Sequence, residues 1–161
     1  MDMHKKIADA LDVLRHADGK SYFNPAQIDA EILQICNTLL AKRGYQNIPD
    51  DYSIFLSQVA GIVGPYFILL TVGGLPLAGG GLQESILRES DVFNESAEDD
   101  DPKTMVVGKM SGNALVIHQD GKYHVIDAAT RDIFRTYDDI ADFIVDTVQK
   151  KDAAIRATAQ Q

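Results

Sequence analysis

The sequence predicts an α+β fold. Helices at the N-terminus and a helix at the C-terminus pack against an antiparallel, meander-rich sheet formed by the middle of the chain. Three observations lead to this class. Apolar residues recur at helical spacing before residue 60, short strand-like runs joined by a hairpin signal follow residue 104, and helical spacing returns near the end. With 161 residues, 45% of them hydrophobic, the chain suits a single domain. We expect residues 1–151 to form it and residues 152–161 to be a frayed tail.

The first predicted helix covers residues 3–16, where Ile7, Leu11 and Leu14 are spaced to share one face. A second helix is expected to begin near Asn24, which can cap it, with Pro25 in its first turn. Its predicted buried stripe follows helical spacing, and Cys36 lies at the border of that stripe. The stripe consists of Ile28, Ile32, Ile35 and Leu39.

Pro49 predicts the start of a third helix, and the acidic pair Asp50 and Asp51 complements the dipole of its first turn. Residues 66–72 are apolar, aromatic and β-branched, which is typical of a central strand. Residues 73–81 are rich in glycine and predict a surface loop, and a short helix follows before the acidic run. The predicted buried face of the third helix is Tyr52, Phe55, Leu56 and Val59.

Short strand-like runs cover residues 105–107, 114–119 and 122–127, and Asp120-Gly121 between the last two is a strong hairpin signal. Thr136 is expected to cap a closing helix. The apolar positions of this helix recur every three or four residues; they are Tyr137, Ile140, Phe143, Ile144 and Val148.

Two histidines flank this hairpin, and such a pair suggests a metal site or an acid-base pair. If Asp120-Gly121 is a two-residue loop, Ile117 pairs with His124, so His118 and His124 point to opposite faces of the sheet. We therefore expect the pair to be structural and the protein to hold no metal.

The charge balance disfavours several kinds of partner. With 24 Asp and Glu against 15 Lys and Arg, the net charge is -9, which opposes contact with nucleic-acid phosphates and anionic membranes. A basic protein partner is favoured instead. The single cysteine, Cys36, cannot form an internal disulfide, and no signal-peptide pattern follows the charged first residues, so we expect a cytoplasmic protein. Glycines and prolines interrupt the apolar stretch 59–78, which argues against a membrane span.

The sequence contains no motif that predicts catalysis. The glycine-rich residues 73–81 lack the spacing of a nucleotide-binding loop, so we expect no cofactor. Cys36 is expected to be a small buried hydrophobe. The acidic run lacks the residue order of a calcium loop and predicts either a solvated loop or a docking patch for basic residues. The run consists of Glu95, Glu98, Asp99, Asp100 and Asp101.

The segment Ile48-Pro49-Asp50-Asp51-Tyr52, with Phe55-Leu56 and then Ala60-Gly61, resembles the signature helix of the SUKH superfamily. This group includes fungal cell-wall regulators of the Smi/Knr type and bacterial immunity proteins. The order of the strand, hairpin and closing helix resembles the second half of the family, and Asn24-Pro25-Ala26 with Glu31-Ile32 resembles its YrhA-like branch. The sequence departs from the pattern at Ala60, where the family usually has asparagine.

The resemblance implies a non-enzymatic protein-binding module, most concretely an immunity protein that binds and neutralises a cognate toxin. A basic nuclease toxin would suit the charge, because an acidic patch can imitate the phosphates that a nuclease binds. Two alternatives stay open: a regulatory scaffold with a physiological protein partner, and a small-ligand-binding domain. The oligomeric state cannot be predicted from the sequence.

Overall fold

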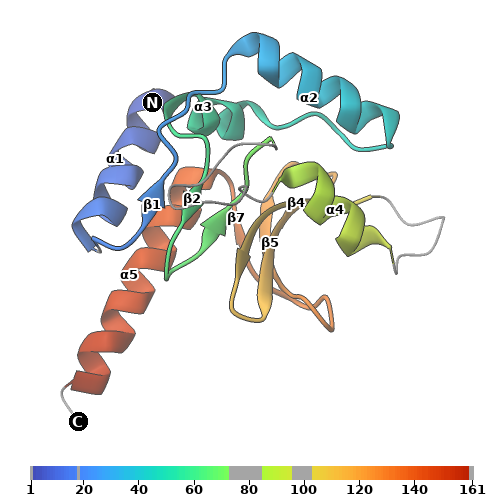
Figure 1. Ribbon diagram of the computed structural model, residues 1–161. Coiled ribbons are helices and arrows are strands. Elements are labelled where there is room, and N and C mark those ends of the chain that lie inside the picture. The colour runs from blue at the N-terminus through green and yellow to red at the C-terminus, as the bar shows by residue number, and fades with distance from the viewer. Residues whose placement is uncertain (1, 18, 73–84, 96–102, 160–161) are drawn as a thin grey trace.

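The computed structural model describes residues 2–17, 19–72, 85–95 and 103–159. Helices precede, interrupt and follow a set of strands (Figure 1). In chain order the elements are α1 (Met3–Ala17), β1 (Tyr22–Phe23), α2 (Ala30–Lys42), α3 (Asp50–Gln58), β2 (Ile62–Val63), β3 (Ile68–Leu69), α4 (Ile86–Asn94), β4 (Met105–Met110), β5 (Asn113–Ile117), β6 (Tyr123–Asp127), β7 (Ile133–Tyr137) and α5 (Ile140–Ala159).

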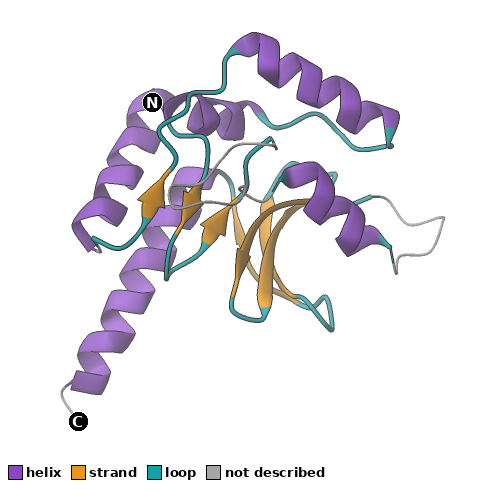
Figure 2. Ribbon diagram, viewed as in Figure 1, coloured by secondary structure: helices purple, strands orange, loops and turns teal. Residues whose placement is uncertain are grey.

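The described strands form one seven-stranded sheet whose spatial order is the chain order, β1 to β7. Each strand is antiparallel to the next, so the sheet is a meander interrupted by helices (Figure 2). Helix α1 packs along α5, and α4 packs on β4. The predicted α+β single domain with an antiparallel meander sheet is therefore confirmed, and the structure adds that the N-terminal and C-terminal helices contact each other. None of the helices in the described ranges has the length and apolar character needed to cross a bilayer.

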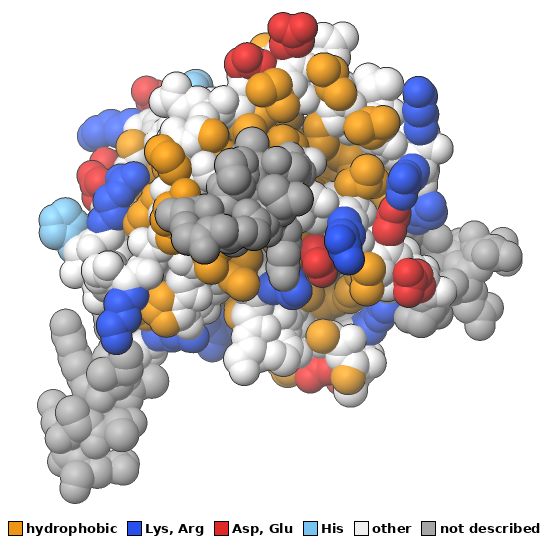
Figure 3. All heavy atoms as spheres, viewed as in Figure 1, with side chains coloured by type: hydrophobic (Ala, Val, Ile, Leu, Met, Phe, Trp, Pro, Cys, Tyr) orange, Lys and Arg blue, Asp and Glu red, His pale blue; other side chains and the backbone are white. Residues whose placement is uncertain are grey.

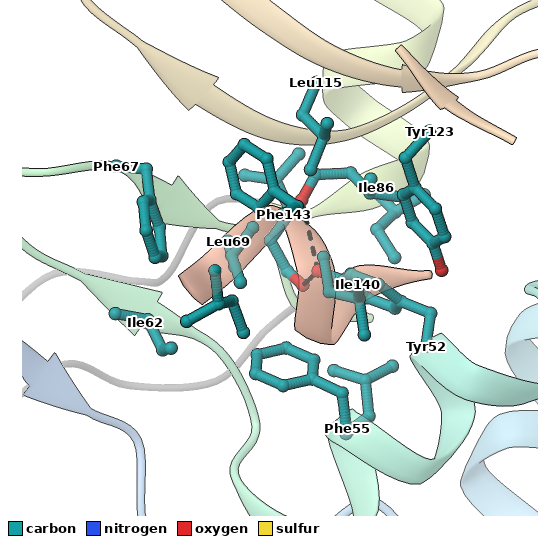
Figure 4. Packing of buried hydrophobic residues seen from close by; sticks show 14 of the residues in the cluster. Tyr52, Phe55, Ile62, Phe67, Leu69, Ile86, Leu115, Tyr123, Ile140 and Phe143 are labelled. Carbon is teal, nitrogen blue, oxygen red and sulfur yellow. Dashed lines mark hydrogen bonds between the residues drawn. The ribbon is translucent and has the colours of Figure 1, made fainter. Parts of the chain in front are cut away.

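The core lies between α3, α5 and the sheet (Figure 4). Phe55 and Leu56 of α3 are completely buried, as predicted, and the ring centroids of Tyr52 and Phe55 are 5.1 Å apart. The buried Tyr52 hydroxyl lies 2.6 Å from the carbonyl oxygen of Leu70 and 3.1 Å from that of Val107. A hydroxyl buried among apolar groups needs such partners, so Tyr52 connects α3 to the strand region beneath it.

Helix α2 differs from its prediction at its start. The backbone of Asn24 exchanges hydrogen bonds with Gly61 and Ala60, which extends the β1–β2 pairing. Because this segment is extended, the chain cannot turn into a helix at Pro25. Asp29 caps α2 instead, and its Oδ1 accepts a hydrogen bond of 2.9 Å from the backbone N–H of Ile32.

The predicted buried stripe of α2 is wrong at three of its four positions, whereas Ile28, which precedes the observed helix, is buried as predicted. Ile32, Ile35 and Leu39 are 41%, 58% and 46% exposed, while Cys36 and Leu40 form the buried side of the helix. The helix is apolar over a wide arc, and only one edge of that arc packs on the core. The other edge remains at the surface.

The hairpin register is shifted by one residue from the predicted one. Ile117 pairs with Tyr123 and Val116 with His124, so residues 118–122 make the connection. The N–H of Gly121 donates to the carbonyl of His118, and Gly121 has φ +77°. These are the marks of a type I turn followed by a left-handed glycine, which makes a longer loop than the two-residue turn that Asp120-Gly121 predicts.

The C-terminal region contains a strand that the sequence analysis missed. Thr136 and Tyr137 belong to β7, so Thr136 does not cap the closing helix. Helix α5 begins at Ile140 and continues to Ala159, beyond its predicted end. Its last turns are rich in alanine, which has the highest helix propensity. The predicted loop at residues 73–81 lies outside the described residues.

Candidate protein-binding surfaces

The predicted acidic docking patch is described only at its edge. Glu95 follows the last turn of α4, and its N–H donates to the carbonyl of Val92. Glu98, Asp99, Asp100 and Asp101 lie outside the described residues. The structure does describe the residues that flank the acidic run on its two sides, among them Asn94 and Thr104.

Asn94 joins the described residues on the two sides of the acidic run. Its Nδ2 donates to the carbonyl of Thr104 at 2.8 Å, and its Oδ1 accepts from the N–H of Thr104 at 3.1 Å. Thr104 is 8% exposed, so its backbone groups need partners within the protein. The paired hydrogen bonds imitate a rung of a β-ladder. The described residues on the two sides of the acidic run consequently lie next to each other.

The same place is joined to the C-terminal end of α2. Arg43 forms an ion pair with Asp91 of α4, and the Tyr45 hydroxyl donates to Asp91 at 2.8 Å. The Lys103 ammonium donates to the carbonyl of Arg43 and lies 5.1 Å from the Tyr45 ring centroid. Burial and the Asp91 charge raise the pKa of Tyr45, so its hydroxyl remains a hydrogen-bond donor.

The helix that ends at this junction, α2, also carries exposed apolar side chains. We call Ile32, Ile35 and Leu39 the α2 apolar face. A shallow groove of about 380 Å³ runs along it. Figure 3 shows hydrophobic side chains gathered on the side of the molecule where α2 lies. The groove is lined by Glu31, Gln34, Ile35, Thr38, Leu39 and Lys42. An exposed apolar face with a polar rim is typical of a protein-protein contact site.

The structure brings the two hairpin histidines together, so the prediction that they point to opposite faces is wrong. The ring centroids of His118 and His124 are 4.8 Å apart. In the shifted register His124 points toward β7, where its Nδ1 lies 2.8 Å from Thr136 Oγ1. Its Nε2 lies 3.0 Å from Asp120 Oδ2. His124 is only 6% exposed, and both of its ring nitrogens have partners.

Thr136, His124 and Asp120 have the order of a hydroxyl, a base and an orienting carboxylate. The three groups come from β7, β6 and the hairpin turn, and their hydrogen bonds connect these segments. In the described ranges, no group of three His, Cys, Asp or Glu side chains is arranged to hold a metal ion. The absence of catalytic residues, expected from the sequence, stays a prediction.

The histidine pair predicts an acid-sensitive fold. Partial burial and the nearby His124 lower the pKa of His118, so the folded protein binds this proton less readily than the unfolded chain. The contribution of neutral His118 to stability is full above the unfolded-state pKa of about 6.5. It is lost as the pH falls through the lower folded-state pKa. We expect His118→Gln to flatten this part of the stability profile, measured as urea midpoints between about pH 7.5 and 5.

His4→Gln is the control for this experiment, because the His4 side chain is 67% exposed. It should leave the pH profile of the wild type unchanged. Equal pH dependence in His118→Gln and the wild type would show that the His118 proton is not linked to folding.

Cys36 is a buried thiol, as the sequence predicts. Burial raises its pKa to about 11, so the thiol is protonated and unreactive near neutral pH. Cys36 therefore contributes to packing.

Comparison with known families and with curated proteins identifies no match: no family model fits the chain, and no curated protein is significantly similar.

Proposed function

We propose that this protein is a non-enzymatic protein-binding module, and specifically an immunity protein that neutralises a basic toxin by covering its active surface. The observation that carries the proposal is the junction of α2 with α4. There, Arg43, Asp91 and Lys103 join the C-terminal end of α2, the helix that carries the α2 apolar face, to the described residues that flank the acidic run. One partner can therefore contact an apolar anchor and a strongly acidic segment together.

The two parts of this surface suit different tasks in binding. Apolar side chains at the centre of an interface supply most of the affinity once water is excluded. Charged residues at the rim mainly steer the encounter and select partners of opposite charge. Five carboxylates in residues 95–101, on a chain of net charge -9, select a basic partner. A nuclease is a suitable target because its active surface is built to attract phosphates.

The resemblance to the SUKH superfamily supports the same conclusion, since that group includes immunity proteins. The resembling residues Tyr52, Phe55 and Leu56 are core positions in this chain. They support a shared scaffold, whereas the binding surface lies on α2 and at the end of α4. The proposal for function thus depends on surface chemistry in addition to the resemblance.

The test begins with the protein encoded by the neighbouring reading frame, co-expressed with this chain and captured by pull-down. Association is then followed by stopped flow with a variant in which all five acids of the run are changed to Gln or Asn. We expect association to slow at least about tenfold at low salt, with a flatter salt dependence. Ile35→Ala should mainly speed dissociation, because it removes apolar contact.

A matched control removes the same number of charges elsewhere. It changes to Asn five exposed acids that lie on or beside α1 and at the start of α5: Asp2, Asp9, Asp12, Asp138 and Asp142. The control should reproduce any general effect of net charge without the loss of steering by the run. Equal association rates in the two variants would reject the acidic run as a docking patch.

A further inference from the structure

Strand β7 is an unprotected edge of the sheet. It pairs with β6 on one side, and no strand in the described ranges pairs with its other side. Ile133 and Phe134 on this strand are 55% and 57% exposed. Proteins usually shield an edge strand, because its free backbone N–H and C=O groups can pair with another chain. An edge that also presents apolar side chains is suited to receive one.

A β-bulge shapes this edge. Val125 pairs with Arg135 and Ile126 with Ile133, so Phe134 is an extra residue without a partner in the ladder. Bulges of this kind turn a side chain away from its regular direction and are common at sheet edges and near binding sites. Here the bulge allows Phe134 and Arg135 to line the same groove.

This groove, of about 580 Å³, lies between the sheet and the C-terminal half of α5. Figure 1 shows α5 running away from the sheet toward its C-terminal end. The lining combines apolar side chains from β4, β6 and β7 with a cationic rim from β7 and α5. Its residues are Met110, Asn113, Val125, Phe134, Arg135, Tyr137, Thr147, Lys150 and Lys151.

The groove is positively charged on an acidic protein. Arg135, Lys150 and Lys151 line it. Asp146 forms ion pairs with two of these cations. Its Oδ2 lies 2.8 Å from Lys150 Nζ and 3.6 Å from Arg135 Nη1. Lys151 donates a hydrogen bond of 3.2 Å to the carbonyl of Pro65. Because a carbonyl carries no net charge, this bond does not neutralise the charge of Lys151. The rim therefore attracts an anionic occupant and repels a basic one.

We propose that β7 and this groove bind an extended acidic peptide segment of a partner protein. The segment adds a strand to the outer edge of β7, packs an apolar side chain against Phe134, and pairs its carboxylates with Lys150 and Arg135. The free edge favours a peptide over a small anionic amphiphile, because only a peptide can form backbone hydrogen bonds along the outer edge of β7. This site has the opposite charge preference from the acidic run and does not depend on the function proposed for that run.

The test uses a fluorescein-labelled heptapeptide that alternates glutamate with valine and phenylalanine, titrated with the full-length protein and followed by anisotropy. We expect Phe134→Ala to weaken binding about tenfold and Lys150→Gln about threefold. Lys5→Gln is the matched control for the charge change on another exposed surface, and it should leave binding unchanged. Phe134 and Lys150 are exposed, so the test variants should fold normally.

Two further peptides separate strand addition from other modes of binding. A peptide with lysine in place of glutamate should not bind, and one that is N-methylated at alternate backbone positions should bind much more weakly, because it cannot complete a ladder. Absence of binding at about 1 mM peptide, or equal binding of the N-methylated peptide, would overturn the proposal. So would a dimer of the chain itself that Phe134→Ala dissociates, because the edge would then be occupied by a second copy.

Discussion

Replacement of Phe55 by alanine is expected to lower the free energy of unfolding by about 3–5 kcal/mol. Phe55 is completely buried, and its ring contacts the Tyr52 ring in the core between α3, α5 and the sheet (Figure 4). Truncation removes the transfer free energy of the ring and leaves a cavity that the surrounding strands and helices can fill only in part. Urea denaturation followed by circular dichroism measures the effect.

Phe134→Ala is the matched control, since it makes the same chemical change at a position that is 57% exposed. It should change the free energy of unfolding by no more than about 0.5 kcal/mol. If Phe55→Ala has the same midpoint as this control, α3 does not form the core that the structure describes.

Helix α3 could be predicted well because its signals are local. Pro49 and the two aspartates define its start, and Tyr52, Phe55 and Leu56 recur at helical spacing. All three are buried. The same kind of reasoning placed α1 and the three long strands before the C-terminal region close to their observed positions.

Helix α2 shows where periodicity stops being informative. Spacing identifies an apolar arc on a helix, but the neighbouring elements decide which edge of that arc is buried. Cys36 and Leu40 take the buried edge, and Ile35 and Leu39 remain exposed. The apolar face left at the surface is therefore a consequence of tertiary packing, and it became a candidate site only in the structure.

The hairpin shows how a small error in register changes a site. Asp120-Gly121 predicts a turn but does not distinguish a two-residue loop from a longer loop with a left-handed glycine. A shift of one residue reverses the face of every side chain on one strand relative to the other. His118 and His124 therefore meet, against expectation. The hydrogen bonds between Asn94 and Thr104, and the groove beside β7, could not be predicted for another reason. Both bring together residues that are not neighbours in the sequence and share no local pattern.

The N-terminus of α5 is held by charged groups from α1, from α3 and from the residue that precedes α5. Asp139 Oδ1 accepts from the N–H of Asp142 at 2.8 Å, so Asp139 caps the helix in place of the expected Thr136. Asp139 Oδ2 accepts from Lys6 Nζ of α1 at 2.6 Å, and this bond contributes most to raising the pKa of Lys6. Asp51 Oδ2 of α3 accepts from the N–H of Ile140 at 2.9 Å. Helices α1, α3 and α5 thus meet at one polar junction.

Asp139→Ala is expected to lower the free energy of unfolding by about 2 kcal/mol, since a lost N-cap costs about 1 kcal/mol and a lost hydrogen bond between charged groups adds a comparable amount. The adjacent Asp138→Ala is the control, because the Asp138 side chain is 81% exposed and its ion pair with Lys122 is long, at 3.7 Å. That variant should remain within about 0.5 kcal/mol of the wild type.

Asp139→Asn should recover part of the loss, since an asparagine oxygen can still cap the helix but carries no charge to pair with Lys6. Urea denaturation near neutral pH compares the four proteins. Equal stability of Asp139→Ala and Asp138→Ala would mean that α5 docks on α1 and α3 through its apolar residues alone, without the polar junction.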